Sequence, residues 1–152
     1  MLNLIFPEYD FKVRHEGTRS FIFDSIRKQY VTLTPEEWVR QHWLHYLVEE
    51  RKYPRSLIAV EMSLKVNRLV RRCDIVVHNK SGLPCLIIEC KAEDVKISQK
   101  VFDQIARYNL SLKVKYLVVS NGSASYCCAI DFEKQTYTFL PDLPDSRQVA
   151  GY

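Results

Sequence analysis

Residues 71–92 have the sequence RRCDIVVHNKSGLPCLIIECKA, in which two apolar runs flank a short polar segment. Strand-forming residues on both sides of HNKSGL predict a β-hairpin closed by a tight turn. The second run places Glu89 and Lys91 where an apolar strand should continue. A buried strand that carries a carboxylate and an ammonium group two residues apart is costly, and it requires an explanation.

Hairpin geometry brings a second carboxylate to the same place. Side chains alternate between the two faces of a strand, so Glu89 and Lys91 share a face. If residues 81–82 form a two-residue turn, Glu89 lies opposite Asp74 on the partner strand. A four-residue turn at 79–82 changes the opposed pairs but keeps the same three side chains on one face. Only a β-bulge would break this inference.

Two interpretations fit this group of charges. In the first, Lys91 forms a salt bridge with one acid at the edge of the sheet, which offsets the cost of burial. In the second, the carboxylates bind a divalent cation such as Mg²⁺, which prefers hard oxygen ligands and retains water molecules for a substrate. Lys91 would then orient an attacking water and offset phosphate charge. The chemistry of these residues alone leaves both interpretations open.

The segments around the hairpin predict an α/β fold. A helix is expected over TPEEWVRQHWLHYLVEE, where Thr34 and Glu37 are placed as a capping box. A strand is expected over SLIAVEMSLKV and a second helix over SQKVFDQIARYNLSL. VKYLVVSNG then predicts a buried strand, and the last segments, SYCCAIDF and QTYTFLP, predict a hairpin. The order is that of a mixed β-sheet flanked by helices, with an α-β-β-β-α-β core.

Composition is that of one globular domain. The chain has 152 residues, of which 47% are hydrophobic and 26% are charged. We expect a single domain over 1–152, with an N-terminal extension (1–33), a core (34–122) and C-terminal edge strands (123–152). The extension contains SFIFDSI, which suggests a strand or an extended arm. The net charge of +4 permits contact with a polyanion but does not require it.

Location and redox state are predicted from what the sequence lacks. No apolar run approaches the roughly 20 residues that span a bilayer, and the N-terminus lacks the pattern of a signal peptide. The five cysteines contain no CxxC pair, so we expect reduced structural thiols rather than disulfides or a zinc site. These observations predict a cytoplasmic protein without a membrane partner.

The hairpin resembles the core of the PD-(D/E)xK nuclease superfamily, with Asp74 as the first acid and Glu89-Cys90-Lys91 as the (D/E)xK element. Cys73 stands where proline commonly precedes the first acid. The segments LTPEEWVRQ, LPCLIIECKA and FDQIARYN, with the later NG, also resemble the N-terminal domain of type I restriction enzyme R proteins. The similarity is to short free-standing versions of that domain and extends from about residue 33 to 122.

This resemblance implies a restriction-endonuclease-like fold and a magnesium site. Asp74, Glu89 and the backbone carbonyl of Cys90 would bind Mg²⁺, with Mn²⁺ as the alternative ion, and Lys91 would position the nucleophilic water. An acid on the first helix commonly completes such sites.

Two acids on the first helix qualify, and their spacing does not decide between them. A capping box would explain Glu37 without catalysis, and Glu36 is at least as well aimed toward the sheet. For Arg40, one turn later, a surface salt bridge is expected, with phosphate contact as the alternative.

The second helix carries a further motif, QIARY. Gln104 and Tyr108 are four residues apart and therefore share a helix face. Related nucleases often carry Q-x-x-x-Y beside the metal site, which implies that Gln104 bonds to catalytic residues or DNA and that Tyr108 supports it. A solvated glutamine beside a half-buried tyrosine is the structural alternative. Four basic residues flank the proposed site and are candidates for phosphate contacts: Arg71, Arg72, Lys96 and Lys100.

These inferences predict a Mg²⁺-dependent nuclease that hydrolyses phosphodiester bonds in DNA. The alternative is a non-cleaving nucleic-acid-binding or assembly module of a restriction-modification system. A purely structural domain is the third class. DNA is the expected partner, together with other restriction-modification subunits, and a homodimer is left open.

Overall fold

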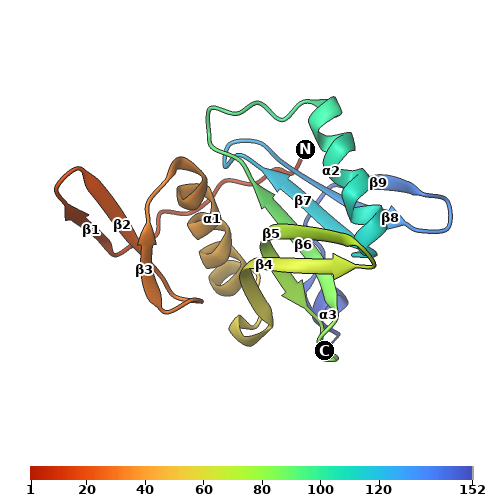
Figure 1. The fold of residues 1–152 in the computed structure, drawn as a ribbon, viewed down its shortest axis with the longest axis horizontal. Helices are drawn as coiled ribbons and strands as arrows, with labels where there is room; N and C mark the ends of the chain where they lie inside the picture. The colour runs from red at the N-terminus through yellow and green to blue at the C-terminus, as the bar shows by residue number, and fades with distance from the viewer. Residues whose placement is uncertain (152) are drawn as a thin grey trace.

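A six-stranded sheet runs through the computed structural model, which describes residues 1–151 except for the side chains of Val66 and Ala150 (Figure 1). β6 and β7 pair in parallel and the other neighbours are antiparallel, which confirms the expected mixed sheet. The strands in spatial order are β4 (Ile58–Val66), β5 (Leu69–His78), β6 (Pro84–Cys90), β7 (Tyr116–Ser120), β8 (Ser125–Asp131) and β9 (Thr136–Leu140).

Helices cover both faces of this sheet, as expected. α1 (Pro35–His45) continues into a π-helical turn (Tyr46–Glu50) and packs against β5 and β6. The short α3 (Ser146–Ala150) packs on the same strands, in a region where only edge strands were expected. α2 (Gln99–Leu112) covers the opposite face and connects the parallel strands β6 and β7. A 3₁₀ turn (Arg55–Leu57) leads into β4.

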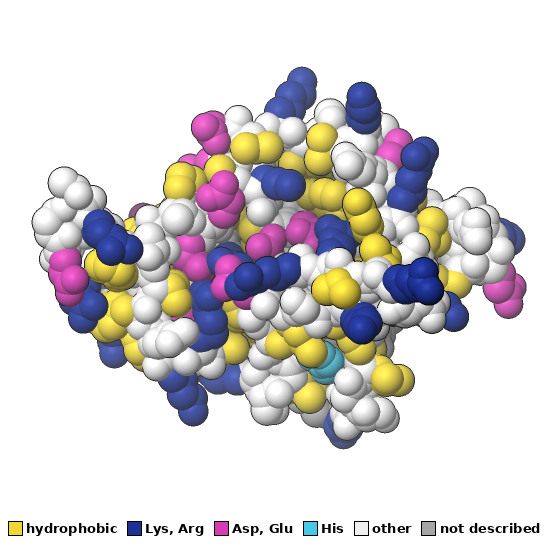
Figure 2. All heavy atoms as spheres, in the orientation of Figure 1, with side chains coloured by type: hydrophobic (Ala, Val, Ile, Leu, Met, Phe, Trp, Pro, Cys, Tyr) yellow, Lys and Arg dark blue, Asp and Glu magenta, His cyan; other side chains and the backbone are white. Residues whose placement is uncertain are grey.

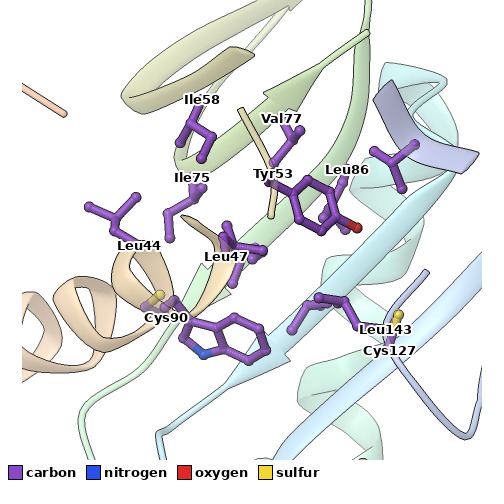
Figure 3. Packing of buried hydrophobic residues seen from close by; sticks show 14 of the residues in the cluster. Leu44, Leu47, Tyr53, Ile58, Ile75, Val77, Leu86, Cys90, Cys127 and Leu143 are labelled. Atoms are coloured by element: carbon purple, nitrogen blue, oxygen red, sulfur yellow. The ribbon is translucent and has the colours of Figure 1, made fainter. Parts of the chain in front are cut away.

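The central strands are buried on both faces, which explains their continuous apolar runs. Leu86 and Ile88 belong to the core beneath α1, whereas Ile87 belongs to the core beneath α2. Figure 3 shows the first core, where Leu44 and Leu47 approach the side chains of β5 and β6. The thiol of Cys90 lies in this core (Figure 3). Among the described residues all five cysteines are free thiols.

A separate three-stranded antiparallel sheet lies beside α1 (Figure 1). It is a meander of β1 (Val13–Glu16), β2 (Arg19–Asp24) and β3 (Gln29–Thr32). Only a strand or an extended arm was expected here, so its partner strands are a finding of the structure.

Asp24 ties this small sheet to α1. Its Oδ1 accepts hydrogen bonds from the backbone N–H groups of Ile26 and Arg27, both at 2.8 Å. Its Oδ2 accepts from Arg27 Nε at 2.8 Å and from Gln41 Nε2 on α1 at 2.9 Å. The side chain is fully buried, and each of its two carboxylate oxygens accepts two hydrogen bonds from within the protein.

Replacing Asp24 by Asn is expected to lower the free energy of unfolding by about 2 to 4 kcal/mol, because Arg27 loses a buried partner. Burial alone would raise the pKa of Asp24, but hydrogen bonds from Arg27 and Gln41 outweigh it and hold that pKa below its usual value. Asp24 therefore stabilises the fold above the pKa of the unfolded chain, and this contribution disappears as the pH falls through the lower folded pKa. Urea unfolding at neutral and acidic pH should show a flatter acid dependence in the variant.

Asp131 provides the matched control. Its Oδ1 also accepts from two backbone N–H groups in a turn, but the residue is exposed. Asp131→Asn should therefore cost less than about 1 kcal/mol. Equal losses in both variants would contradict the role assigned to Asp24.

Among residues 1–151, the structure contains no helix long and apolar enough to span a membrane.

Candidate functional site

The β5–β6 hairpin brings Asp74 to the level of Glu89, although neither expected turn is present. Asn79 N donates to Leu83 O at 2.8 Å, which leaves a three-residue loop at 80–82. Beyond the loop the register shifts by one residue, because His78 pairs with Pro84 whereas Val77 pairs with Leu86. This bulge restores the register that a two-residue turn would have produced. A bulge was expected to separate the side chains of Asp74 and Glu89, but this bulge keeps the two residues at the same level.

Asp74 lies where β5 and β6 separate. The β5–β6 ladder ends at the pair of Ile75 and Ile88, directly before the level of Asp74 and Glu89. Asp74 Oδ2 then accepts a hydrogen bond from the backbone N–H of Cys90 at 2.8 Å. A side-chain carboxylate thus takes the place of a backbone acceptor at the end of the ladder, which fixes Asp74 relative to β6.

Glu61 marks a reversal of the pleat next to Asp74. Val60 packs with the core under α1 but Met62 packs with the core under α2, although residues two apart normally share a face. Their partners on β5 differ in the same way: Ile75 packs in the core under α1, and Cys73 packs in the core under α2. Between them Glu61 has φ +52°, an unfavourable conformation for a side-chain-bearing residue. Asp74, at the same level on β5, therefore lies at the switch between the two faces.

Glu89 is the more buried of the two acids, with 10% of its side chain exposed against 28% for Asp74. Arg71 Nη2 lies 2.9 Å from Glu89 Oε1. That oxygen nevertheless receives no well-directed hydrogen bond, so the contact is an ion pair only. Burial raises the pKa of Glu89 to about 7; a hydrogen bond with Asp74 adds to this effect, whereas Arg71 and Lys91 oppose it.

Arg71 is held rigidly by α2. Its guanidinium lies over the ring of Tyr108, 5.0 Å from the centroid, and donates to Asn109 Oδ1 at 3.2 Å. Asn109 is fully buried and was not identified from the sequence, although it directly follows the QIARY motif. Tyr108 thus packs against Arg71, and the residue is 45% exposed, which agrees with the half-buried tyrosine of the structural alternative.

A surface groove of about 380 Å³ opens beside the acids. Neither Asp74 nor Glu89 is among its lining residues; Arg71, the partner of Glu89, forms part of the wall. The functional candidates that line it are Arg71, Arg72, Lys91, Gln104 and Tyr108. Figure 2 shows acidic side chains at the centre of this face with Lys and Arg side chains around them.

Two basic candidates lie outside the groove lining. Lys96 is exposed in the segment before α2, and Lys100 is exposed in the first turn of that helix. Any phosphate contact that they make would therefore lie beyond the groove itself.

The first helix presents Glu37, not Glu36, to the site. Glu36 is exposed, whereas Glu37 is buried and accepts from Arg40 Nε at 2.9 Å and Nη2 at 2.7 Å. Thr34 Oγ1 caps Glu37 N at 3.1 Å as expected, but the Glu37 side chain turns inward instead of completing a capping box. The interpretation of Glu37 as the second half of a capping box is therefore wrong, and of the two acids that the sequence left open, Glu37 is the one that faces the sheet.

Arg40 joins the helix to the acids of the sheet. Its Nη1 donates to Asp74 Oδ1 at 3.2 Å and its Nη2 to Glu61 Oε1 at 3.3 Å. Only 9% of the side chain is exposed, so the expected surface salt bridge is instead a buried one. Burial alone would lower the pKa of Arg40, but Glu37, Asp74 and Glu61 raise it well above its usual value.

Oxygen ligands for a metal ion are present, but they are few. Among the described residues no three His, Cys, Asp or Glu side chains are grouped so as to hold a metal ion. The candidate ligands are the Asp74 and Glu89 carboxylates with the Cys90 carbonyl, a set that suits Mg²⁺ because this ion retains several waters. Glu89 Oε1 is buried without a well-directed hydrogen bond, so a bound cation would compete for it with the Arg71 guanidinium at 2.9 Å. The residues present therefore fit a magnesium ion that displaces Arg71 and keeps water as its remaining ligands.

Comparison with known protein families identifies the family of the chain. Residues 35–144 match the family model of the type I restriction enzyme R protein N terminus (HSDR_N). No curated protein matches the sequence. The matched segment contains both carboxylates, Lys91 and the whole of α2.

Proposed function

Because the chain belongs to the family of type I restriction enzyme R protein N-terminal domains, we propose that it is a Mg²⁺-dependent nuclease that hydrolyses phosphodiester bonds in DNA. One observation carries the proposal. The β5–β6 hairpin holds two carboxyl groups, Asp74 and Glu89, at the same level beside a groove that contains Lys91. Two carboxylates held close together repel each other unless a proton or a cation lies between them.

The expected chemistry assigns a role to each side chain. Asp74, Glu89 and the Cys90 carbonyl would hold Mg²⁺, which when bound supplies Lewis acidity and lowers the pKa of water. Lys91 orients the attacking water and offsets charge on the phosphate oxygens. The water oxygen forms a bond to phosphorus and releases a proton to solvent, the bond to the leaving oxygen breaks, and that oxygen gains a proton from solvent. Gln104 and Arg72, which line the groove, contact the phosphate backbone.

A second candidate function rests on the arginines. Arg40 and Arg71 already pair with Asp74 and Glu89, so both acids have a cationic partner without a metal ion. A domain of this kind would bind nucleic acid or other restriction-modification subunits without cleaving DNA. The two proposals make opposite predictions for cleavage in the presence of metal.

Lys91→Ala is expected to slow cleavage of plasmid and linear DNA by about 10² to 10³-fold at saturating Mg²⁺, because one charge-stabilising donor is lost. Lys134→Ala removes the same charge from an exposed turn outside the groove, and it should remain within about twofold of wild type. Gel electrophoresis of timed digests measures both rates.

Wild-type protein that cleaves nothing with either Mg²⁺ or Mn²⁺ would support the non-cleaving module. Cleavage that Lys91→Ala leaves unchanged would show that the activity comes from another site or another protein.

A further inference from the structure

The sheet β1–β2–β3 has two chemically different faces. Ile22 and Asp24 point to the body of the protein and are fully buried. Residues at alternate positions point outward, and the register places Arg14 beside Phe21 and Phe23 beside Tyr30 on that outer face. The inner face thus anchors the sheet, and the outer face is available to a partner.

Cations lie over aromatic rings across this outer face. Arg14 is 4.6 Å from the centroid of Tyr30 and 5.5 Å from that of Phe21. Arg19, two residues before Phe21 on β2, lies 5.4 Å from the centroid of the Phe21 ring. Lys12, just before β1, lies 5.5 Å from the centroid of Phe23. Such contacts hold long cationic side chains in place without neutralising them.

The acids of the three strands cancel only part of this charge. Asp24 is buried and bound to Arg27. Glu16 is exposed and lies 3.2 Å from Arg14, whereas Arg19 and Lys12 have no acidic partner among the described residues. Guanidinium groups fixed against flat rings favour a ligand that presents phosphates, and nucleic acid adds bases that stack on exposed rings such as Tyr30.

The sheet is connected to the groove by ion pairs. Arg27, between β2 and β3, lies 3.3 Å from Glu61, and Glu61 lies 2.9 Å from Arg72 in the groove wall. Figure 2 shows Lys and Arg side chains beside hydrophobic ones on the three-stranded sheet at the left, on the same side as the central acidic group. A single duplex could therefore contact both places.

We propose that the outer face of β1–β2–β3 is a second DNA-binding surface, which contacts the sugar–phosphate backbone beyond the segment held at the groove. Lys12, Arg14 and Arg19 provide the phosphate contacts, and Phe21, Phe23 and Tyr30 hold these cations in position. The identity of the ligand rests on the proposed function, but binding at this face requires neither metal nor cleavage.

The test is DNA binding by the full chain in the presence of EDTA, measured by fluorescence anisotropy at several salt concentrations. Arg14→Ala/Arg19→Ala should weaken binding of a linear duplex by about 10 to 60-fold at moderate salt, since each phosphate contact contributes almost one decade there. The slope of log K against log salt should become shallower by about 2. The control Lys134→Ala/Arg147→Ala removes two exposed charges elsewhere and should change neither quantity. Circular dichroism melting checks that both double variants are folded.

The outcomes separate this surface from the nuclease. Binding by Arg14→Ala/Arg19→Ala with wild-type affinity and slope would overturn the surface, whatever the cleavage assay shows. Loss of DNA binding in that variant, with no cleavage by wild type, would uphold the surface and overturn the nuclease. If wild-type protein does not bind DNA but binds anionic phosphatidylserine vesicles through these arginines, DNA is not the ligand of this surface.

Discussion

The Glu89→Gln variant is expected to lose metal-dependent DNA cleavage by at least about a thousandfold, because a buried ligand oxygen loses its charge. Its free energy of unfolding should stay within about 1 kcal/mol of wild type or rise, since burying an incompletely bonded carboxylate is itself costly. Glutamine keeps the shape of the side chain and an acceptor for Arg71. Lost cleavage together with unchanged or increased stability is the result expected for a residue that serves catalysis at a cost to stability.

The matched control is Glu93→Gln, the same substitution at an exposed position four residues later. It should leave both cleavage and stability unchanged. Timed digestion and urea unfolding measure the two properties on the same samples. If Glu89→Gln unfolds the protein, or if it cleaves DNA at the wild-type rate, Glu89 is a structural ion-pair partner and not a metal ligand.

The Arg40→Met variant should lose about 3 to 5 kcal/mol of stability, the cost of removing one partner from a buried ion pair. Glu37, whose side chain is only 5% exposed, loses both of its short contacts with Arg40, and Asp74 loses its contact at 3.2 Å. Methionine preserves much of the apolar stem, so lost packing contributes little. Urea unfolding at neutral pH measures the change.

A second substitution tests the cause of that loss. Adding Glu37→Gln to Arg40→Met should recover at least about 1 kcal/mol, because it removes a buried charge that has lost Arg40 and keeps only its ion pair with Arg27 at 2.9 Å. Arg107→Met, on the exposed side of α2, should cost less than about 0.5 kcal/mol. If Arg40→Met is as mild as Arg107→Met, the arginine does not stabilise the acids as described.

Local periodicity was sufficient to predict the convergence of Asp74 and Glu89. Alternation along two strands depends only on neighbouring residues, and the apolar runs of β5 and β6 specify which residues are buried. The loop was not predictable to the same precision, since an additional loop residue and a one-residue bulge compensate for each other. Similarly, Thr34 was predictable as a helix cap because the bond is local.

The partners of the acids were not predictable, because they come from distant segments. Arg40 would be an ordinary surface residue if Glu61 and Asp74 did not meet it from β4 and β5. Glu61 lies inside a strand-forming segment, and nothing local indicates its left-handed backbone. Asp24 had a usable signal, since a turn aspartate commonly accepts hydrogen bonds from the backbone N–H groups two and three residues later. Its burial, however, depends on α1.

The central claim is that Asp74 and Glu89 together hold a divalent cation, and calorimetric titration with Mn²⁺ tests it most directly. Wild-type protein should bind one Mn²⁺ per chain, and Mg²⁺ should compete for the same site. Asp74→Asn should abolish this binding while Asp103→Asn, a carboxylate on α2 that contacts Tyr137, leaves it intact. Absence of binding at millimolar Mn²⁺, or undiminished binding by Asp74→Asn, would contradict the account.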